Sequence, residues 1–169
     1  PTTANQDFAV TNGTVYAIAV DGNYTYIGGA FTYVGMNTGY GIKITANSSV
    51  PSTSFPKVNG TINCVTSDGS GGWYIGGSFT KVGSYSRNYI AHINSDGSVN
   101  TTWNPNANGY VYSIAINGSN VYVGGNFSTI GAQTRKAIAK LNNTNGNADA
   151  SWNANLDNLN PTVYTIAIT

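Results

Sequence analysis

The chain has 169 residues, a formal net charge of +1 and charged residues at only 8% of its positions, whereas ordinary globular domains have about 25%. So few Lys and Arg side chains exclude a nucleic-acid surface, and no apolar run approaches the roughly 20 residues that a membrane span needs. Asn, Thr, Ser and Gly, present at 24, 20, 15 and 21 positions, are weak helix formers, so the composition predicts an all-β protein.

The first element in chain order is an apolar strand that recurs along the sequence. Its copies read VYAIAV, INCVTS, VYSIAI and VYTIAI, and they begin at Val15, Ile62, Val111 and Val163. Apolar, β-branched residues on both faces predict a strand that is buried on both sides. Asp-Gly or Asn-Gly follows the first three copies and predicts tight type I′ hairpin turns, at Asp21, Asp68 and Asn117.

A Gly-Gly segment recurs at a constant spacing after these turns. Its copies are YIGGAFTYVG, YIGGSFTKVG and YVGGNFSTIG, over 26–35, 74–83 and 122–131. A third apolar strand follows each copy and ends at Ile44, Ile93 and Leu141. After a second turn and a short polar strand, each unit closes on an aromatic residue, namely Phe55, Trp103 and Trp152, and Phe8 closes a preceding unit.

Four hairpin-linked antiparallel strands with a 48-residue repeat predict a β-propeller made of four-stranded blades. A parallel β-helix would not place hairpin turns inside every repeat, and a β-sandwich would not copy its sequence. We expect about three complete blades with partial blades at both ends: the end of a preceding blade over 1–12, blades over 13–58, 59–107 and 108–156, and the first strand of a further blade over 157–169.

Three blades are fewer than the four to eight that normally close a propeller. The sequence therefore predicts one of two partners: the remainder of the same propeller in a longer protein, or other copies of the chain that associate into a ring or filament.

These motifs resemble the delta-sixty repeat, a β-propeller family of bacterial and archaeal surface proteins catalogued as a domain of unknown function. The Gly-Gly pairs carry the resemblance, together with Phe31, Phe79, Phe127, Arg87, Arg135 and the Trp103-Asn104-Pro105 run. The resemblance implies a propeller fold and an extracellular or cell-surface location, and it implies no particular chemistry.

The titratable residues fit repeat positions better than a reaction centre. His92 aligns with two lysines on the third strand, where alternation predicts a solvated side chain. Cys64, the single cysteine, aligns with small residues and forms no internal disulfide. Arg87 and Arg135 occupy the same place in successive units and are expected to bond turn carbonyls. We therefore expect no catalytic residues, no metal site and no cofactor.

Tyrosines in or near the loops are the candidate binding residues, because binding sites form where repeats differ. They would stack on a glycan or on the surface of a cell-surface protein, and they are Tyr33, Tyr40, Tyr85, Tyr89 and Tyr110. Sequons for N-glycosylation occur at Asn12, Asn23, Asn47, Asn59, Asn100, Asn117, Asn126 and Asn142.

The sequence thus predicts a non-enzymatic extracellular or cell-surface propeller segment with a structural, adhesive or binding role. One alternative is a hydrolase or lyase acting on polysaccharide, whose carboxylates would come from Asp7, Asp149, Asp157 or the turn aspartates. The other alternative is a subunit of a self-assembling surface filament or ring.

Overall fold

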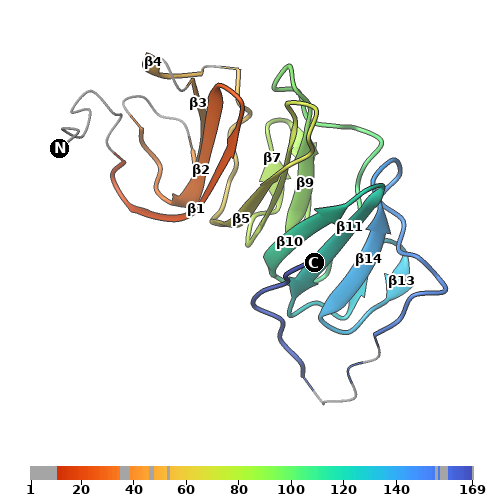
Figure 1. The fold of residues 1–169 in the computed structure, drawn as a ribbon. Helices are drawn as coiled ribbons and strands as arrows, with labels where there is room; N and C mark the ends of the chain where they lie inside the picture. Colours follow the sequence, from red (N-terminus) through yellow and green to blue (C-terminus); the bar gives the residue numbers. More distant parts are fainter. Residues whose placement is uncertain are drawn as a thin grey trace.

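The computed structural model describes residues 11–34, 39–45, 48–52, 54–154, 156 and 160–168. Within these ranges the regular elements are β-strands arranged in small antiparallel sheets, which confirms the predicted all-β class (Figure 1). No helix among the described residues is long and apolar enough to cross a membrane.

The first sheet has four strands in the order β1-β2-β3-β4. They are β1 (Thr14–Asp21), β2 (Tyr24–Ala30), β3 (Gly41–Thr45) and β4 (Ser48–Pro51). Each strand is antiparallel to the next, so the sheet is a meander of consecutive hairpins.

The second and third sheets have three strands each, in the orders β5-β6-β9 and β10-β11-β14. The second contains β5 (Ile62–Ser67), β6 (Trp73–Gly77) and β9 (Ile90–Ile93). The third contains β10 (Val111–Asn117), β11 (Asn120–Gly125) and β14 (Ile138–Asn142). A two-stranded hairpin precedes the last strand of each sheet, and the sequence did not predict these hairpins: β7 (Lys81–Val82) with β8 (Tyr85–Ser86), and β12 (Thr129–Ile130) with β13 (Gln133–Thr134).

The fourth segment of these two sheets makes a single bridge in place of a strand. Val99 bridges Ile93, and Ala148 bridges Leu141. Just after the bridge at Val99, a side chain binds the backbone: Asn100 Oδ1 accepts hydrogen bonds from the N–H groups of Thr102 and Trp103.

The first hairpin turn of each sheet differs from the predicted type I′. Gly22 and Gly118 have positive φ, of 54° and 57°, and occupy the first central position, whereas the residue after each has negative φ. This is the pattern of a type II′ turn. The corresponding loop of the second sheet is longer, since Ser67 pairs with Trp73 and the Asp68 N–H bonds the Gly72 carbonyl.

The three sheets stand side by side along an arc, in chain order (Figure 1). β5 contacts β1 and β2 of the first sheet, and β10 contacts β5 and β6 of the second. The first strand of each sheet therefore packs against the preceding sheet.

The first glycine of each Gly-Gly pair makes this packing possible. A Cβ at Gly28 would meet the Ile62 side chain, one at Gly76 would meet Val111, and one at Gly124 would meet Val163. We call each of these spaces a glycine socket. Each socket receives the branched side chain that begins the next copy of the apolar strand.

The second glycine of each pair has a different role. A Cβ at Gly29, Gly77 or Gly125 would meet the carbonyl oxygen of the residue that precedes the paired strand or begins it. The strand register shifts at the same place, for example between Ile62 and Cys64. A bulge brings the two backbones too close for a side chain.

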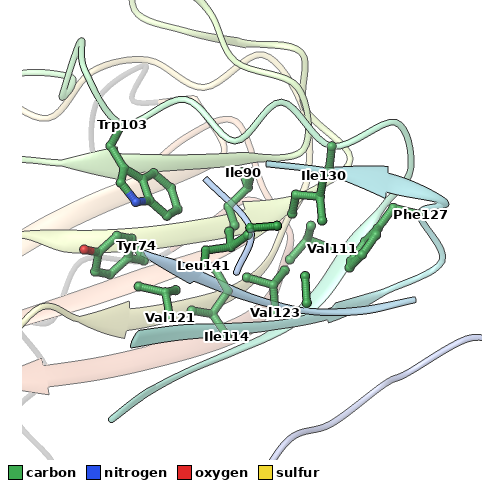
Figure 2. Packing of buried hydrophobic residues seen from close by; sticks show 13 residues of the cluster. Tyr74, Ile90, Trp103, Val111, Ile114, Val121, Val123, Phe127, Ile130 and Leu141 are labelled. Atoms are coloured by element: carbon green, nitrogen blue, oxygen red, sulfur yellow. The ribbon is translucent and has the colours of Figure 1, made fainter. Parts of the chain in front are cut away.

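The hydrophobic core lies between neighbouring sheets as well as within them. In the third sheet, Val111, Val121, Val123 and Leu141 pack with Tyr74 and Ile90 of the second sheet and with Trp103 of the connecting segment (Figure 2). The Trp103 Nε1–H donates to the Asn142 carbonyl at 3.0 Å, which ties that segment to the third sheet.

An asparagine near the start of each unit clamps the loop after the Gly-Gly pair. Asn108 Oδ1 accepts hydrogen bonds from the N–H groups of Ser128 and Thr129, and its Nδ2 donates to Ser128 Oγ. Asn12 and Asn59 make the same three hydrogen bonds in the other two units.

We predict that Gly76→Ala destabilises the fold by about 1–3 kcal/mol, because the new methyl group overpacks the socket against Val111, its nearest neighbour, and against Cys64 Sγ. Val111→Ala removes buried apolar surface and should by itself lower the free energy of unfolding by about 2–3 kcal/mol. In the double variant the smaller side chain at position 111 makes room for the methyl group. The stability lost by the double variant should therefore be smaller than the sum of the losses of the two single variants. Urea unfolding of the four chains measures this coupling, and strictly additive losses would contradict the socket.

Asn108→Ala should lower the free energy of unfolding by about 2 kcal/mol, because it removes three hydrogen bonds that hold the loop. Asn108→Asp retains the acceptor oxygens and should lose less. Asn104→Ala, at an exposed asparagine just before Asn108 in the chain, is the matched control for urea unfolding. Equal stability of the Asn104 and Asn108 variants would refute the clamp.

Candidate functional site

The structure brings two of the five predicted binding tyrosines together. The rings of Tyr89 and Tyr110 meet edge to face, with centroids 5.6 Å apart. Tyr33 is exposed in the loop after β2, Tyr85 is exposed in β8, and Tyr40 is half-buried against the core between the first two sheets. The predicted set is therefore not one surface.

Two further tyrosines extend the pair into a row. Tyr112 lies 6.4 Å from Tyr110, and Tyr164 lies 5.2 Å from Tyr112, between ring centroids. We call Tyr89, Tyr110, Tyr112 and Tyr164 the tyrosine row. Tyr110 is 45% exposed and Tyr164 is 72% exposed, so the row has an open aromatic surface.

Three separate segments position the row. Tyr89 directly precedes β9, whereas Tyr110 and Tyr112 lie at the start of β10. Tyr164 comes from the C-terminal segment, which bonds the third sheet through the Val163 N–H to the Gly125 carbonyl and through the Ile166 N–H to Ser113 Oγ.

Tyr89 has a left-handed backbone, with φ of 66°, and Ala137 has the same conformation at the equivalent place in the next unit, with φ of 62°. In both places the N–H bonds a phenylalanine carbonyl, and the carbonyl accepts the N–H of the second glycine of the pair. The left-handed backbone is therefore common to the second and third units. The equivalent residue of the first unit is Tyr40, whose carbonyl accepts the Gly29 N–H in the same way and whose φ is not positive.

Partial burial raises the pKa of Tyr112, and the neighbouring phenols of Tyr164 and Tyr110 raise it further. Tyr112 thus remains neutral over the physiological pH range, and the middle of the row presents an uncharged ring and hydroxyl group.

Sequence reasoning missed Tyr112 and Tyr164 because both lie within a repeated strand. Their register position holds Tyr16 in the first unit and Asn63 in the second. Asn63 could have revealed these two tyrosines as candidates, because it shows that the repeated strand does not require tyrosine at this position.

His92 was predicted to be solvated, and the structure corrects this. The residue is 9% exposed, and its ring stacks on the Tyr74 ring with centroids 4.2 Å apart. The distance between His92 Nε2 and Asp68 Oδ2 is 2.8 Å. The long loop after β5 causes the burial, because Asp68 also accepts the N–H groups of Ser70 and Gly72 and so holds the loop over the ring.

The lysine at the same register position in the third sheet also pairs with a carboxylate. Lys140 Nζ lies 2.8 Å from Asp149 Oδ2. The hydrogen bond from Lys140, together with bonds from Ser151, holds the pKa of Asp149 well below its usual range. In the first sheet Lys43 lies over the Tyr24 ring, 3.9 Å from its centroid. The position therefore holds a nitrogen group with a different partner in each sheet.

Burial raises the pKa of the Cys64 thiol to about 12, against a smaller opposing effect of a hydrogen bond with the Gly76 backbone. A thiol that resists ionisation is a poor nucleophile. Cys64 Sγ lies beside the Gly76 socket, in agreement with a position chosen for small size.

Arg87 and Arg135 have the expected backbone role. Each guanidinium is buried and donates to the carbonyl of the preceding residue. A second nitrogen donates to the carbonyl of Asn100 or Asp149, at 2.9 and 2.7 Å. The arginines thus join the entry of the third strand to the closing segment of each unit.

The sequons fall into two structural groups. Side-chain amides hold backbone or loop groups at Asn12, Asn59, Asn100, Asn126 and Asn142. Asn23 and Asn117 are exposed at hairpin turns. Asn47 lies outside the described residues, as do Asp7, Phe8 and Asp157. Glycosylation at any of these sequons stays a prediction.

Among the described residues, no group of three or more His, Cys, Asp or Glu side chains is placed to hold a metal ion. The aspartates of the second and third sheets bond turn N–H groups or their cationic neighbours, as Asp68, Asp96 and Asp149 do.

Residues 67–102 and 120–151 match a family model described as "Domain of unknown function (DUF5122) beta-propeller". The match supports a β-propeller domain of unknown function. The two matched segments cover most of the second and third sheets, where the hairpins and the buried arginines recur. The delta-sixty resemblance is not confirmed by this match. No curated protein matches the chain.

We predict that Tyr74→Phe makes stability less sensitive to alkaline pH. Burial raises the pKa of Tyr74 to about 12, so the folded state favours the neutral phenol. This stabilisation is complete below the unfolded-state pKa of about 10 and is lost as the pH rises from there through 12. Between pH 9.5 and 11.5 the wild-type chain should lose about 2 kcal/mol more than the variant.

Urea unfolding at a series of pH values measures this difference. Tyr33→Phe, at an exposed position, is the control and should retain the wild-type profile. If the Tyr74 variant follows the wild-type chain at every pH, the buried phenol has no such effect.

Proposed function

We propose that this chain is a non-enzymatic segment of an extracellular or cell-surface β-propeller, and that it binds a neutral glycan through the tyrosine row. The fold we propose for the segment is a series of four-stranded blades with a 48-residue period. The glycine sockets, the asparagine clamps and the buried arginines support this period, because each recurs at equivalent places in the structure.

The tyrosine row is the observation that carries the binding role. An exposed cluster of large aromatic side chains on a folded domain marks an interaction surface more often than single exposed residues do. Tyrosine offers a rigid, amphipathic contact surface with few rotatable bonds, so little side-chain entropy is lost on binding. In the described structure each of the four rings lies within contact distance of the next one in the row.

A glycan fits the chemistry of this surface. The face of a sugar ring is apolar and packs on an aromatic ring, while its hydroxyl groups bond polar side chains at the rim. Asn126 Oδ1 accepts the Tyr110 N–H, so amide groups lie beside the row. The net charge of +1 and the low charged fraction favour a neutral ligand.

The proposed location follows from the surface composition. Few charged residues, many Asn, Thr and Ser side chains and two sequons at exposed hairpin turns are typical of surface proteins, and the family resemblance points the same way.

Tyr110→Ala and Tyr164→Ala should each weaken glycan binding at least about tenfold, the effect of losing about 1.4 kcal/mol of stacking. A neutral glycan array identifies the ligand for the wild-type chain, and calorimetry with that glycan measures the affinities. Tyr33→Ala, 48% exposed and outside the row, is the matched control and should bind within twofold of wild type.

Two outcomes would reject the proposal. One is a folded wild-type chain that binds no glycan on the array, and the other is binding that survives loss of both row tyrosines. Circular dichroism of each variant separates lost contacts from lost structure.

A further inference from the structure

The outward face of β1 is an exposed apolar surface. Tyr16, Ile18 and Val20 alternate along the strand and are 56%, 65% and 66% exposed. The residues that correspond to Ile18 in the next two sheets are covered: Val65 lies against Gly28 of the first sheet, and Ile114 is buried with Tyr74 of the second. β1 therefore has the side chains for packing on a preceding sheet.

The matching surface of the chain is the third glycine socket. Val163 fills it at Gly124, and Ile166 lies beside Val163. These residues belong to VYTIAI, which differs from the VYAIAV of β1 at two positions, Thr165 for Ala17 and Ile168 for Val20. The socket thus holds a near copy of β1.

The sockets also differ in size. In the first, Gly41 stands beside Gly28, and the space accepts the larger Ile62. In the second and third, an isoleucine replaces Gly41, since Ile90 pairs with Gly76 and Ile138 pairs with Gly124. These narrower sockets accept valine, and the equivalent residue of β1 is Val15. By size, β1 fits the third socket.

The segment that fills the third socket lies outside any strand ladder of the described residues. The Val163 and Ile166 N–H groups join it to the third sheet by hydrogen bonds to the Gly125 carbonyl and to Ser113 Oγ. A hollow of about 360 Å³ opens beside it, lined by residues that include Phe127, Lys136 and Pro161. β1, by contrast, has the paired strands β2 to β4 behind it.

We propose that β1 of a second copy of this chain docks in the Gly124 socket in exchange for residues 163–168, which joins the copies head to tail. Val15 of the incoming copy takes the place of Val163, Ile18 takes that of Ile166, and Tyr16 takes that of Tyr164 in the tyrosine row. The proposal rests on the sheet packing and is independent of glycan binding.

The contact is heterologous, because one surface of a copy meets a different surface of the next. Such a contact builds rings when the rotation closes and filaments when it does not. The tethered segment competes at an effective concentration on the order of millimolar. We therefore expect the wild-type chain to be mainly monomeric at micromolar concentration and to associate as the concentration rises.

Val163→Asp with Ile166→Asp, in the full chain, should expel the tethered segment and open the socket. Sedimentation velocity at micromolar concentration should then show at least a doubling of the molar mass relative to wild type. Adding Ile18→Asp to this variant should restore the monomer, whereas adding Tyr33→Asp, at an exposed position elsewhere, should not. Ile18 is exposed in the single chain, so its replacement leaves the fold intact.

A mixing experiment tests the direction of the contact. The triple variant with Ile18→Asp can only accept a strand, and the wild-type chain can only donate one while its own socket is filled. Mixed, they should form a one-to-one complex that does not grow further.

The proposal is overturned if the open-socket variant remains monomeric, or if its association persists after Ile18→Asp. If the Val163→Asp and Ile166→Asp substitutions unfold the chain, sedimentation velocity over a series of protein concentrations provides the test. The wild-type chain should associate at high concentration, and the Ile18→Asp variant should not. Equal behaviour of those two chains also overturns it.

Discussion

The close approach of one sheet to the next depends on the absence of a side chain at Gly28, Gly76 and Gly124. At each of these glycines the space that a Cβ would fill is taken by the branched residue that begins the next apolar strand. This contact fixes the distance between sheets and the position of the next strand along them. The Phe31, Phe79 and Phe127 rings, buried just after the glycines, fill the core that this spacing leaves. Because the contact joins neighbouring units only, the order of the sheets follows the order of the chain.

The repeated parts of this structure were predictable because three copies make the signal independent of any single residue. The Gly-Gly pairs allow close packing, Arg87 and Arg135 bond backbone carbonyls, and Trp103 lies in the core, as the sequence led us to expect. What the sequence did not reveal depends on contacts between segments that have no shared period. The longer loop after β5 brings Asp68 over His92. Strand alternation at His92 carries no information about this loop and therefore predicted a solvated side chain. The prediction of a type I′ turn was wrong for a local reason, because Gly22 occupies the first of the two central positions of the turn.

The tyrosine row, which we propose as a binding surface, includes a position at which the equivalent residues of the units differ. Tyr89 shares its left-handed backbone with Ala137 of the third unit, which has no ring, and its aromatic side chain with Tyr40 of the first unit, whose backbone is not left-handed. At the position of Tyr112 the second unit has Asn63, whose Nδ2 donates to the Val111 carbonyl and serves the packing between sheets. The same place in the repeat therefore holds a structural amide in one copy and an aromatic ring of the row in another. A scaffold that is stabilised by its glycines, asparagines and arginines leaves such positions free to change.

The glycine sockets also determine which apolar strand packs against which sheet. A chain in which only 8% of the residues are charged has few ion pairs with which to reject a wrong neighbour, so the fit of one side chain in one socket decides which strands pack together. Between Ile62 and the valines the difference is one methylene group, which is worth about 1 kcal/mol in a well-packed site. That is enough to favour one register among units of a single chain, where the tether already limits the choice. Between separate chains it is a weak barrier, and for this reason we propose that β1 of one copy can pack in a socket of valine size in another copy. The contact that orders the sheets within the chain is the same contact that the proposed exchange between chains would use.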